Sequence, residues 1–341
     1  MASTLESTLT RAWLRRGPLA WALLPVALLF RLLSGLRRLL FRIGVKRAER
    51  LPVPVIVVGN IFIGGTGKTP LTIWLAESLR AAGLNPGVIS RGHGGQEGAA
   101  LEVTPQSDPR AVGDEPLLIA ARAGCPVVVG RRRVEAGRKL LQAHPEVDVL
   151  IADDGLQHYA LARDVEIVLF DGRGVGNGWL LPAGPLREPP SRRRDFTVVN
   201  APELDPALAR AVGGQPWRMH LAGDYAEPLQ GGVRLPLAGL RDKRIVAAAG
   251  IGNPGRFFAM LRAAGLAVAE LPLPDHHDFL DDPFKAVDAD VILITEKDAV
   301  KCRQIDHLKD DPRLWVVPVT AQLDSRLAEQ IVEKCRGRSL A

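Results

Sequence analysis

The run Gly-Gly-Thr-Gly-Lys-Thr at positions 64–69 combines residue types that together bind phosphate. It follows the β-branched run 55–58 and precedes apolar side chains with helical spacing, so it joins a buried strand to a helix. Glycines allow backbone N–H groups to converge on phosphate oxygens, and the helix N-terminus adds the positive end of its dipole. In such a loop the ammonium group of Lys68 reaches the β- and γ-phosphates, and the hydroxyl group of Thr69 binds Mg²⁺. The expected nucleotide-binding residues are Gly64, Gly65, Thr66, Gly67, Lys68 and Thr69.

The loop departs from the commonest phosphate-loop spacing in one respect. Phe62 stands five residues before the Gly67-Lys68 pair, where a glycine is usual. A glycine-rich turn without a ligand is the alternative to a phosphate site. The strand before the loop and the helix after it favour the phosphate site.

Three carboxylates stand beside predicted elements that could bring them to this loop. Asp114 and Glu115 open a predicted helix, and Asp153 ends an apolar strand predicted at 147–152. A carboxylate at the end of such a strand can bind Mg²⁺, as in a Walker B element, and paired carboxylates can supply a general base and a metal ligand. The alternatives are an N-cap at Asp114, a helix-dipole partner at Glu115 and an Asp-Gly turn at 153–155.

Further polar residues follow other predicted strands. Arg91 comes directly after the strand at 87–90, at the sheet edge where α/β proteins bind ligands, so it could contact a phosphate group. Gln157 and His158 follow the carboxylate strand and are expected at the same edge. The Pro- and Gly-rich stretch 180–190 is a long loop, and long loops inside compact domains are often functional.

Two other clusters have ambiguous chemistry. The arginine run 131–133 is typical of a solvated helix start, although it could also contact an anionic substrate. Residues 275–278 contain two adjacent histidines between aspartates, which could bind a metal, but no third ligand has a readable spacing. We favour a single catalytic histidine there, acting across a cleft between two domains.

Strands and helices alternate along the chain, which is typical of a doubly wound, mainly parallel α/β sheet. A Gly- and Pro-rich stretch at 223–240 indicates a linker, and a second alternating pattern follows it. We therefore expect a phosphate-loop domain at 51–222, a smaller α/β domain at 241–341 and a helical segment at 1–50. The three cysteines are widely spaced and form no metal-ligand or disulfide pattern, so they suit a reducing cytoplasm.

The first 50 residues carry the excess positive charge of the chain. They contain ten Lys or Arg and two Glu, a net charge of +8, whereas the remaining residues have a net charge of −2. This distribution disfavours a nucleic-acid-binding surface. The run 17–30 has no charged residue and is shorter than the roughly 20 residues of a spanning helix. Arg31, Arg38 and Arg42 then share one helical face and leucines another, which is typical of a helix lying in an anionic membrane surface.

Three arrangements of residues 17–43 are compatible with this pattern. The helix could pack on the protein, span the membrane once with Arg31 near the lipid surface, or lie in the membrane surface without crossing it. We favour the third arrangement, on the cytoplasmic face of the membrane.

Several motifs occur in order along nearly the whole chain. They are Gly59-Asn60 with Gly-Gly-Thr-Gly-Lys-Thr-Pro at 64–70, Ser90-Arg91-Gly92, Gly113-Asp114-Glu115-Pro116, Asp-Asp-Gly-Leu-Gln-His at 153–158, Leu-Pro-Ala-Gly-Pro-Leu-Arg-Glu at 181–188, Gly-Ile-Gly-Asn-Pro at 250–254, and Asp275-His276. In this ordered set the chain resembles the tetraacyldisaccharide 4′-kinase family of the lipid A pathway in Gram-negative bacteria. The phosphate loop alone is unspecific, but the ordered set is highly specific.

The resemblance implies an enzyme that transfers the γ-phosphate of ATP, with Mg²⁺, to the 4′-hydroxyl of a tetraacylated glucosamine disaccharide 1-phosphate. It implies that Asp114 accepts the hydroxyl proton with help from His276, for which His277 is the alternative. The implied Mg²⁺ ligands are Thr69, Glu115 and Asp153, with Lys68 on the phosphates. The implied head-group residues are Arg91, Asp154, Gln157, His158 and Arg187. The expected partners are the lipid substrate and the membrane surface, with no nucleic acid, and we expect a monomer.

Other nucleotide-binding classes fit the sequence less well. A membrane-recruited ATPase of the partitioning type has a signature Lys where this chain has Ile63. A GTPase would have Gly three residues after Asp153 or Asp154, and residues 295–298 lack the Lys-x-Asp spacing used for guanine recognition. A non-catalytic membrane scaffold would leave the carboxylates near the phosphate loop unexplained.

Overall fold

The apolar runs of the sequence form strands that are buried on both faces. The computed structural model describes residues 12–92 and 100–337. In it every residue of β1 (Val55–Asn60), β2 (Pro86–Ser90) and β5 (Val149–Asp153) is buried. Strands that are apolar on both faces need helices on both faces of their sheet, which is the arrangement of a parallel α/β fold.

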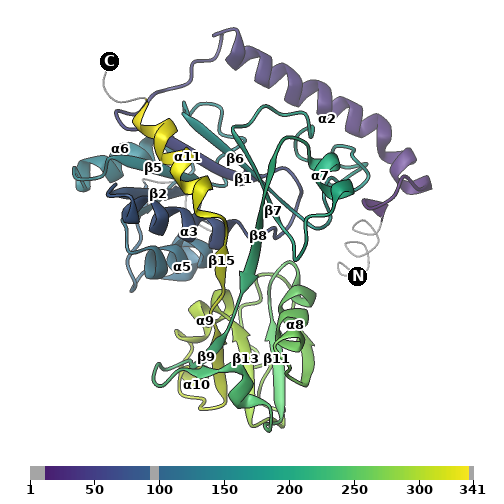
Figure 1. The fold of residues 1–341 in the computed structure, drawn as a ribbon, viewed down its shortest axis with the longest axis vertical. Helices are drawn as coiled ribbons and strands as arrows, with labels where there is room; N and C mark the ends of the chain where they lie inside the picture. The colour runs from purple at the N-terminus through teal and green to yellow at the C-terminus, as the bar shows by residue number, and fades with distance from the viewer. Residues whose placement is uncertain (1–11, 93–99, 338–341) are drawn as a thin grey trace.

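The described residues form a larger sheet of nine strands in the order β15-β8-β7-β6-β1-β5-β2-β4-β3 (Figure 1). Its other strands are β3 (Leu101–Glu102), β4 (Val127–Val129), β6 (Val165–Asp171), β7 (Phe196–Asn200), β8 (Pro216–Ala222) and β15 (Thr320–Gln322). All neighbours pair in parallel except the edge strands β3 and β15, which are antiparallel. The chain runs from β1 to β2 on one side and later to β6 on the other. The carboxyl ends beside β1 therefore border the crevice where doubly wound sheets bind ligands.

Helices cover both faces of the larger sheet. One face packs against α3 (Lys68–Ala81), α5 (Asp114–Ala123), which follows the short α4 (Pro109–Val112), and α11 (Ser325–Arg336). The other face packs against α6 (Arg133–Ala143) and α7 (Pro206–Val212). The predicted doubly wound, mainly parallel α/β sheet is confirmed.

A smaller sheet lies at the end of the molecule opposite the N-terminal helix (Figure 1). Its six strands follow the order β10-β9-β14-β13-β11-β12 within the described residues. They are β9 (Tyr225–Pro228), β10 (Leu235–Pro236), β11 (Ile245–Ala249), β12 (Val268–Pro272), β13 (Val291–Thr295) and β14 (Leu314–Val317). Its helices are α8 (Pro254–Ala263), α9 (Glu296–Cys302), α10 (Asp306–Lys309) and a 3₁₀ turn at Leu237–Leu240. Separate apolar clusters fill the two sides of this sheet.

The membership of the two sheets differs from the predicted boundaries. The expected linker 223–240 contains β9 and β10, which belong to the smaller sheet. At the other end, β15 pairs with β8 and α11 packs on α3, so residues 320–336 belong to the larger sheet. These strands have two to four residues and are therefore too short to show a periodicity in the sequence. Their sheet membership is decided by contacts with residues that are distant in the sequence.

Helix α2 (Pro18–Arg42) rests on the loop that joins β6 to β7. The ring of Trp21 packs edge-on against Trp179, with 4.8 Å between the centroids. Just before the helix, the indole N–H of Trp13 donates to the carbonyl oxygen of Pro182 at 2.9 Å. The N-terminal segment is therefore fixed to the same Pro- and Gly-rich loop that carries the Leu-Pro-Ala-Gly-Pro-Leu-Arg-Glu motif.

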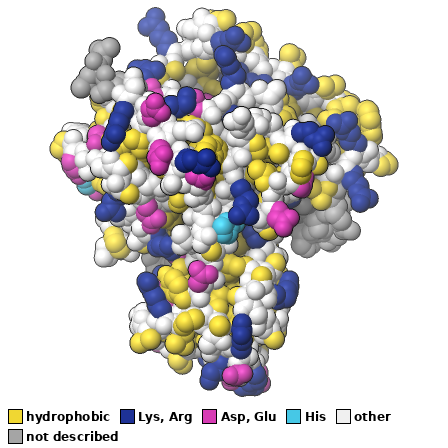
Figure 2. All heavy atoms as spheres, in the orientation of Figure 1, with side chains coloured by type: hydrophobic (Ala, Val, Ile, Leu, Met, Phe, Trp, Pro, Cys, Tyr) yellow, Lys and Arg dark blue, Asp and Glu magenta, His cyan; other side chains and the backbone are white. Residues whose placement is uncertain are grey.

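Most of the surface of α2 faces away from the protein. Its exposed large apolar side chains are Leu19, Trp21, Val26, Leu28, Leu29, Leu32, Leu33, Leu36 and Leu39. In Figure 2 hydrophobic and basic side chains lie together along the upper right, where α2 runs. By length and composition it is the one helix in the described residues that could cross a membrane. Arg38, expected beside Arg31 and Arg42, instead turns towards the protein and pairs with Glu188 at 3.4 Å.

Gly184 in the β6–β7 loop is predicted to be essential for stability. A Cβ atom there would overlap the Trp179 carbonyl oxygen and the Asn177 side chain, and backbone cannot move aside cheaply. We expect Gly184→Ala to lower the free energy of unfolding by about 1–3 kcal/mol, measured by urea denaturation in detergent. Gly172→Ala in the same loop is the matched control, because a Cβ atom there meets nothing within 4 Å. Equal stability of the two variants would contradict this packing.

Candidate functional site

Asn60, the last residue of β1, organises the phosphate loop. Its side-chain N–H donates to the carbonyl oxygen of Gly64 at 3.1 Å, and its Oδ1 accepts a hydrogen bond from Lys68 Nζ at 3.1 Å. Gly67, just before α3, has φ of 99°, a conformation that favours glycine, and a Cβ atom there would come 2.5 Å from Asn200 Nδ2. Asn60 and Asn200 were not predicted from the sequence to have a role in the site. Their position as last residues of parallel strands is the signal that could have found them.

Two threonine hydroxyls lie inside the loop and its helix. Thr66 is fully buried, its carbonyl oxygen accepts from Asn200 Nδ2 at 2.9 Å, and its Oγ1 has no hydrogen-bond partner among the described residues. Thr69 is buried in the first turn of α3. A buried polar atom without a partner costs free energy unless a ligand satisfies it. The loop is therefore shaped for a polar ligand.

Asp153 ends β5 directly beside the loop. Its two carboxylate oxygens accept hydrogen bonds from the hydroxyls of Thr72 and Ser90, each at 3.2 Å. Burial and the negative charge of Glu115 raise the pKa of Asp153 to about 6, against the opposing effect of Lys68. A divalent cation would relieve this crowding of negative charge, so the group suits a metal site.

Asp154, the next residue, lies between two cations. Its Oδ1 is 3.8 Å from Lys68 Nζ, and its Oδ2 is 3.4 Å from Arg187 Nη1. Burial alone would raise the pKa of Asp154, but the charges of Lys68 and Arg187 outweigh it and lower the pKa. Asp154 thus joins the phosphate loop to the β6–β7 loop that carries Arg187.

Asp114 is a buried carboxylate at the start of α5 that is held by residues of the smaller sheet. Its Oδ2 is 3.3 Å from His276 Nδ1, 3.3 Å from Lys301 Nζ and 3.8 Å from Lys297 Nζ. Burial opposes ionisation, but the close contact with His276 and the two lysine charges outweigh it and hold the pKa of Asp114 well below its usual range. The same contact raises the pKa of His276. Asp114 is therefore ionised at neutral pH.

Lys297 and Lys301 on α9 are site residues that sequence analysis missed. Lys297 Nζ donates to Glu115 Oε1 at 3.2 Å, and Lys301 Nζ donates to the carbonyl oxygen of His277 at 3.0 Å. Two lysines four residues apart on one helix face are the signal that could have found them. The ring of His277 is directed elsewhere, since its Nδ1 accepts from the backbone N–H of Phe279 at 3.0 Å. His276 is therefore the histidine that contacts Asp114.

Two of the expected head-group residues, Gln157 and His158, follow β5 in the chain. Gln157 Nε2 donates to Glu188 Oε1 at 3.2 Å. Burial, followed by the positive charges of Arg133 and Arg91, lowers the pKa of His158 to about 4, so its imidazole is neutral at physiological pH. This concentration of positive charge beside a neutral histidine suits an anionic ligand.

Arg133 is a further residue that sequence analysis misjudged, because the run 131–133 is typical of an exposed helix start. Its guanidinium is buried, with Nη1 donating to the carbonyl oxygen of Gly130 at 2.7 Å and Nη2 to that of Asp153 at 3.4 Å. Burial lowers the pKa of Arg133 to about 10, against the raising effect of Asp153 and Asp154. Arg133 therefore remains charged at neutral pH and lies against the backbone of Asp153.

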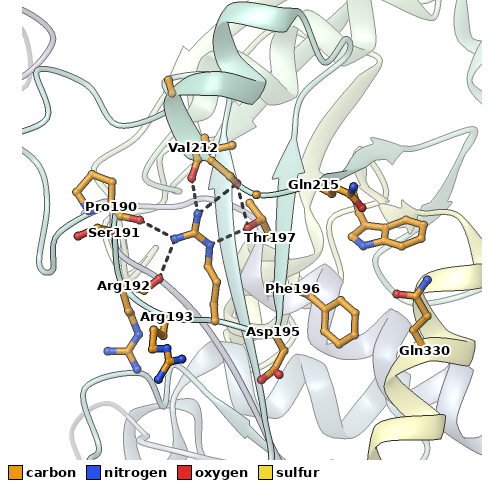
Figure 3. A pocket seen from close by; sticks show the side chains of 15 residues that line it. Pro190, Ser191, Arg192, Arg193, Asp195, Phe196, Thr197, Val212, Gln215 and Gln330 are labelled. Atoms are coloured by element: carbon orange, nitrogen blue, oxygen red, sulfur yellow. Dashed lines mark hydrogen bonds between the residues drawn. The ribbon is translucent and has the colours of Figure 1, made fainter.

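A separate pocket of about 720 Å³ lies near the amino-terminal end of β7 (Figure 3). Arg194 lines it, and its guanidinium donates to the backbone carbonyl oxygens of Pro190, Val212 and Gly213. Its positive charge is therefore already satisfied by the protein. None of the expected site residues lines this pocket.

The fold brings the expected site residues to one edge of the larger sheet, at the carboxyl ends of β1, β2 and β5, with His276 added from the smaller sheet. These residues are Gly64, Gly65, Thr66, Gly67, Lys68, Thr69, Arg91, Asp114, Glu115, Asp153, Asp154, Gln157, His158, Arg187 and His276. Positive and negative groups alternate across the edge: Lys68, Asp154 and Arg187 on one side, and Glu115, Lys297 and Asp114 on the other.

Known proteins resemble this chain in sequence and in fold. Residues 19–336 match the family model described as tetraacyldisaccharide-1-P 4′-kinase. The tetraacyldisaccharide 4′-kinases of Herminiimonas arsenicoxydans and Janthinobacterium sp. (strain Marseille) are each 62% identical to this chain over 99% of its length and cover 98% and 99% of their own. A crystal structure described as the "apo" form of LpxK from Aquifex aeolicus in complex with ATP is 29% identical, with a TM-score of 0.77 over 93% of this chain and 99% of that one.

These matches span both sheets and most of α2, and they confirm the predicted family and enzyme class. The chain belongs to the tetraacyldisaccharide-1-P 4′-kinase family, the kinases of lipid A biosynthesis.

Proposed function

We propose that this kinase binds ATP and Mg²⁺ in the phosphate loop and transfers the terminal phosphoryl group to the 4′-hydroxyl of a tetraacyldisaccharide 1-phosphate. The observation that carries the proposal is the convergence of Lys68, Asp153 and Asp114 at one sheet edge from three different elements. The description of the Aquifex aeolicus relative in complex with ATP supports the choice of nucleotide.

The loop residues 64–69 hold the phosphates of ATP. Their backbone N–H groups and the start of α3 provide the positive end of a helix dipole. The hydrogen bond from Lys68 to Asn60 keeps the ammonium group over the loop, so little reorganisation is needed when the phosphates arrive.

Thr69, Glu115 and Asp153 would hold Mg²⁺, directly or through water. They offer the oxygen ligands that Mg²⁺ prefers, and the raised pKa of Asp153 reflects the excess negative charge that a divalent cation would neutralise. Bound Mg²⁺ would neutralise charge on the β- and γ-phosphate oxygens.

Asp114 accepts the proton of the attacking hydroxyl group. The hydroxyl oxygen forms the new bond to the γ-phosphorus, the bond between that phosphorus and the β,γ-bridging oxygen breaks, and the proton passes to the Asp114 carboxylate. A carboxylate with a low pKa is a weak base, which suits a loose transition state in which the proton leaves late. His276 and Lys301 keep the carboxylate ionised and hold its Oδ2 oxygen in place.

Arg91, Asp154, Gln157, His158 and Arg187 bind the sugar head group of the acceptor. Arg91 and Arg187 supply positive charge for its phosphate, and Gln157 and the neutral His158 supply hydrogen bonds for its hydroxyl and amide groups. The buried charge of Arg133 adds to the attraction for an anion without direct contact.

The exposed apolar face of α2 brings the enzyme to the membrane that contains its acylated substrate. We propose attachment to the cytoplasmic face of the inner membrane with the helix in the membrane surface, since basic residues interrupt and follow its apolar run. We also propose that the enzyme acts as a monomer.

Replacing Asp114 tests its role as the base. Asp114→Asn is expected to lower kcat by roughly 100- to 10,000-fold while the KM for ATP changes little, because the amide cannot accept the proton. The measurement is transfer of labelled phosphate from ATP to the lipid disaccharide in detergent. Asp281→Asn is the control, since that carboxylate is exposed and pairs only with His277, at 3.5 Å, among the described residues. A kcat for Asp114→Asn within threefold of the control would refute the assignment.

Replacing two leucines tests membrane attachment through α2. Leu29 and Leu33 are 55% and 57% exposed, so changing both to Glu is expected to reduce binding to phosphatidylethanolamine–phosphatidylglycerol vesicles roughly tenfold or more. Activity on substrate dispersed in detergent should persist. Val233→Glu is the control, because Val233 is 78% exposed but lies in the smaller sheet's β9–β10 connection. Vesicle binding of the double variant equal to that of the control would argue against this attachment.

A further inference from the structure

One buried carboxylate at the carboxyl edge is shared by two arginines. Asp171 is the last residue of β6 and is fully buried. Arg173, two residues later, donates to both of its oxygens, with Nη2 2.7 Å from Oδ2 and Nε 3.0 Å from Oδ1. Arg256, from α8 of the smaller sheet, reaches the same Oδ2 with its Nη2 at 3.3 Å.

Both arginine-bearing segments border the phosphate loop. The guanidinium of Arg173 lies over the ring of Phe62, 4.2 Å from its centroid, and its Nη1 is 3.8 Å from where a Cβ atom on Gly64 would stand. The turn before Arg256 is equally close, because a Cβ atom on Gly252 would lie 3.3 Å from the backbone nitrogen of Gly65. The Arg173 side chain and the turn before Arg256 therefore both lie close to the phosphate loop.

The charges at this point do not balance. Asp171 contributes one negative charge, and the two guanidinium groups contribute two positive charges. Arg173 already uses its planar fork on the carboxylate, whereas Arg256 makes one longer contact and stays about one-third exposed. In the described residues Asp171 is the only acidic partner of Arg256. A guanidinium with five N–H donors and one carboxylate contact retains donors for a further anion.

We propose that Arg256 is a ligand for the terminal phosphates of the nucleotide, delivered to the phosphate loop by the smaller sheet. In this structure it contacts Asp171; when ATP is bound it turns to the β- and γ-phosphate oxygens, and Asp171 keeps Arg173. A guanidinium fork matches phosphate oxygens in pairs and stabilises the charge that they carry during transfer. This inference rests on the proposed binding of ATP in the phosphate loop.

The competing explanation is that Arg256 and Asp171 form only a structural link between the two sheets. The two explanations differ in their response to the ligand and to Asp171. If the pair were only a structural link, Arg256→Ala and Asp171→Asn would weaken nucleotide binding to a similar extent. The loss would also be the same for all nucleotides. If Arg256 binds the phosphates, Arg256→Ala would weaken the binding of ATP and ADP specifically. Asp171→Asn, which releases Arg256 from its carboxylate partner, would not weaken ATP binding.

The test is calorimetric titration of the full-length enzyme in detergent with ATP, ADP and AMP. Arg256→Ala is expected to bind ATP and ADP about 10- to 100-fold more weakly, with AMP nearly unchanged. Arg256→Lys, which keeps the charge but not the fork, should fall between Arg256→Ala and wild type. Arg262→Ala is the matched control, since Arg262 lies on the same helix and pairs with the exposed Glu270 on β12. Asp171→Asn should bind ATP at least as tightly as wild type.

Each outcome decides the question. ATP binding by Arg256→Ala within twofold of Arg262→Ala would overturn this inference alone, as would equal losses for ATP and AMP. If Asp171→Asn folds, as judged by thermal unfolding, a loss of ATP binding equal to that of Arg256→Ala would also overturn it. If that variant does not fold, the comparison of ATP with AMP decides. Failure of wild-type enzyme to bind ATP would overturn the proposed nucleotide site, and this inference with it.

Discussion

The ion pairs between Asp114 and the smaller sheet are the interaction on which the site depends. A buried carboxylate loses its hydration, a cost of several kcal/mol, and it stays ionised only with opposite charges in place. Lys301 at 3.3 Å and Lys297 at 3.8 Å supply those charges, and His276 contacts the same oxygen at 3.3 Å from another segment of the smaller sheet. The larger sheet carries the phosphate loop and the carboxylates, but Asp114, the proposed base, has these partners only when the second sheet is docked. Gly252 comes close to the phosphate loop at the same interface, since a Cβ atom on it would lie 3.3 Å from the backbone nitrogen of Gly65.

The N-terminal helix is connected to the acceptor side of the site through a short chain of polar contacts. Arg38 on α2 pairs with the buried Glu188 at 3.4 Å, and Glu188 also accepts a hydrogen bond from Gln157. Because Arg187 precedes Glu188, one short segment contacts both the helix and the Asp154 carboxylate. The exposed apolar helix is therefore fixed directly to the segment that we propose binds the sugar. An acceptor whose acyl chains remain near α2 would have its head group close to this segment.

The sequence alone predicted the elements of the site whose residues lie close together in the chain. The phosphate loop and Asp153 are readable because strand, loop and helix follow one another within a few residues. Asn200 and Lys301 were not readable as site residues because their roles come from contacts with residues more than 100 positions away. The same limit explains β15, whose three residues pair with a strand about 100 positions earlier. Resemblance to a family, by contrast, depends on ordered motifs and needed no knowledge of these contacts.

The most direct test of the account is a crystal structure of the enzyme with a non-hydrolysable ATP analogue, Mg²⁺ and the disaccharide acceptor. We expect an Asp114 carboxylate oxygen about 3 Å from the 4′-hydroxyl oxygen, with that oxygen in line with the γ-phosphorus and the leaving oxygen. His276 should still contact Asp114 from the smaller sheet. An acceptor bound with Asp114 remote from its 4′-hydroxyl, or a γ-phosphate directed away from this edge of the sheet, would contradict the account.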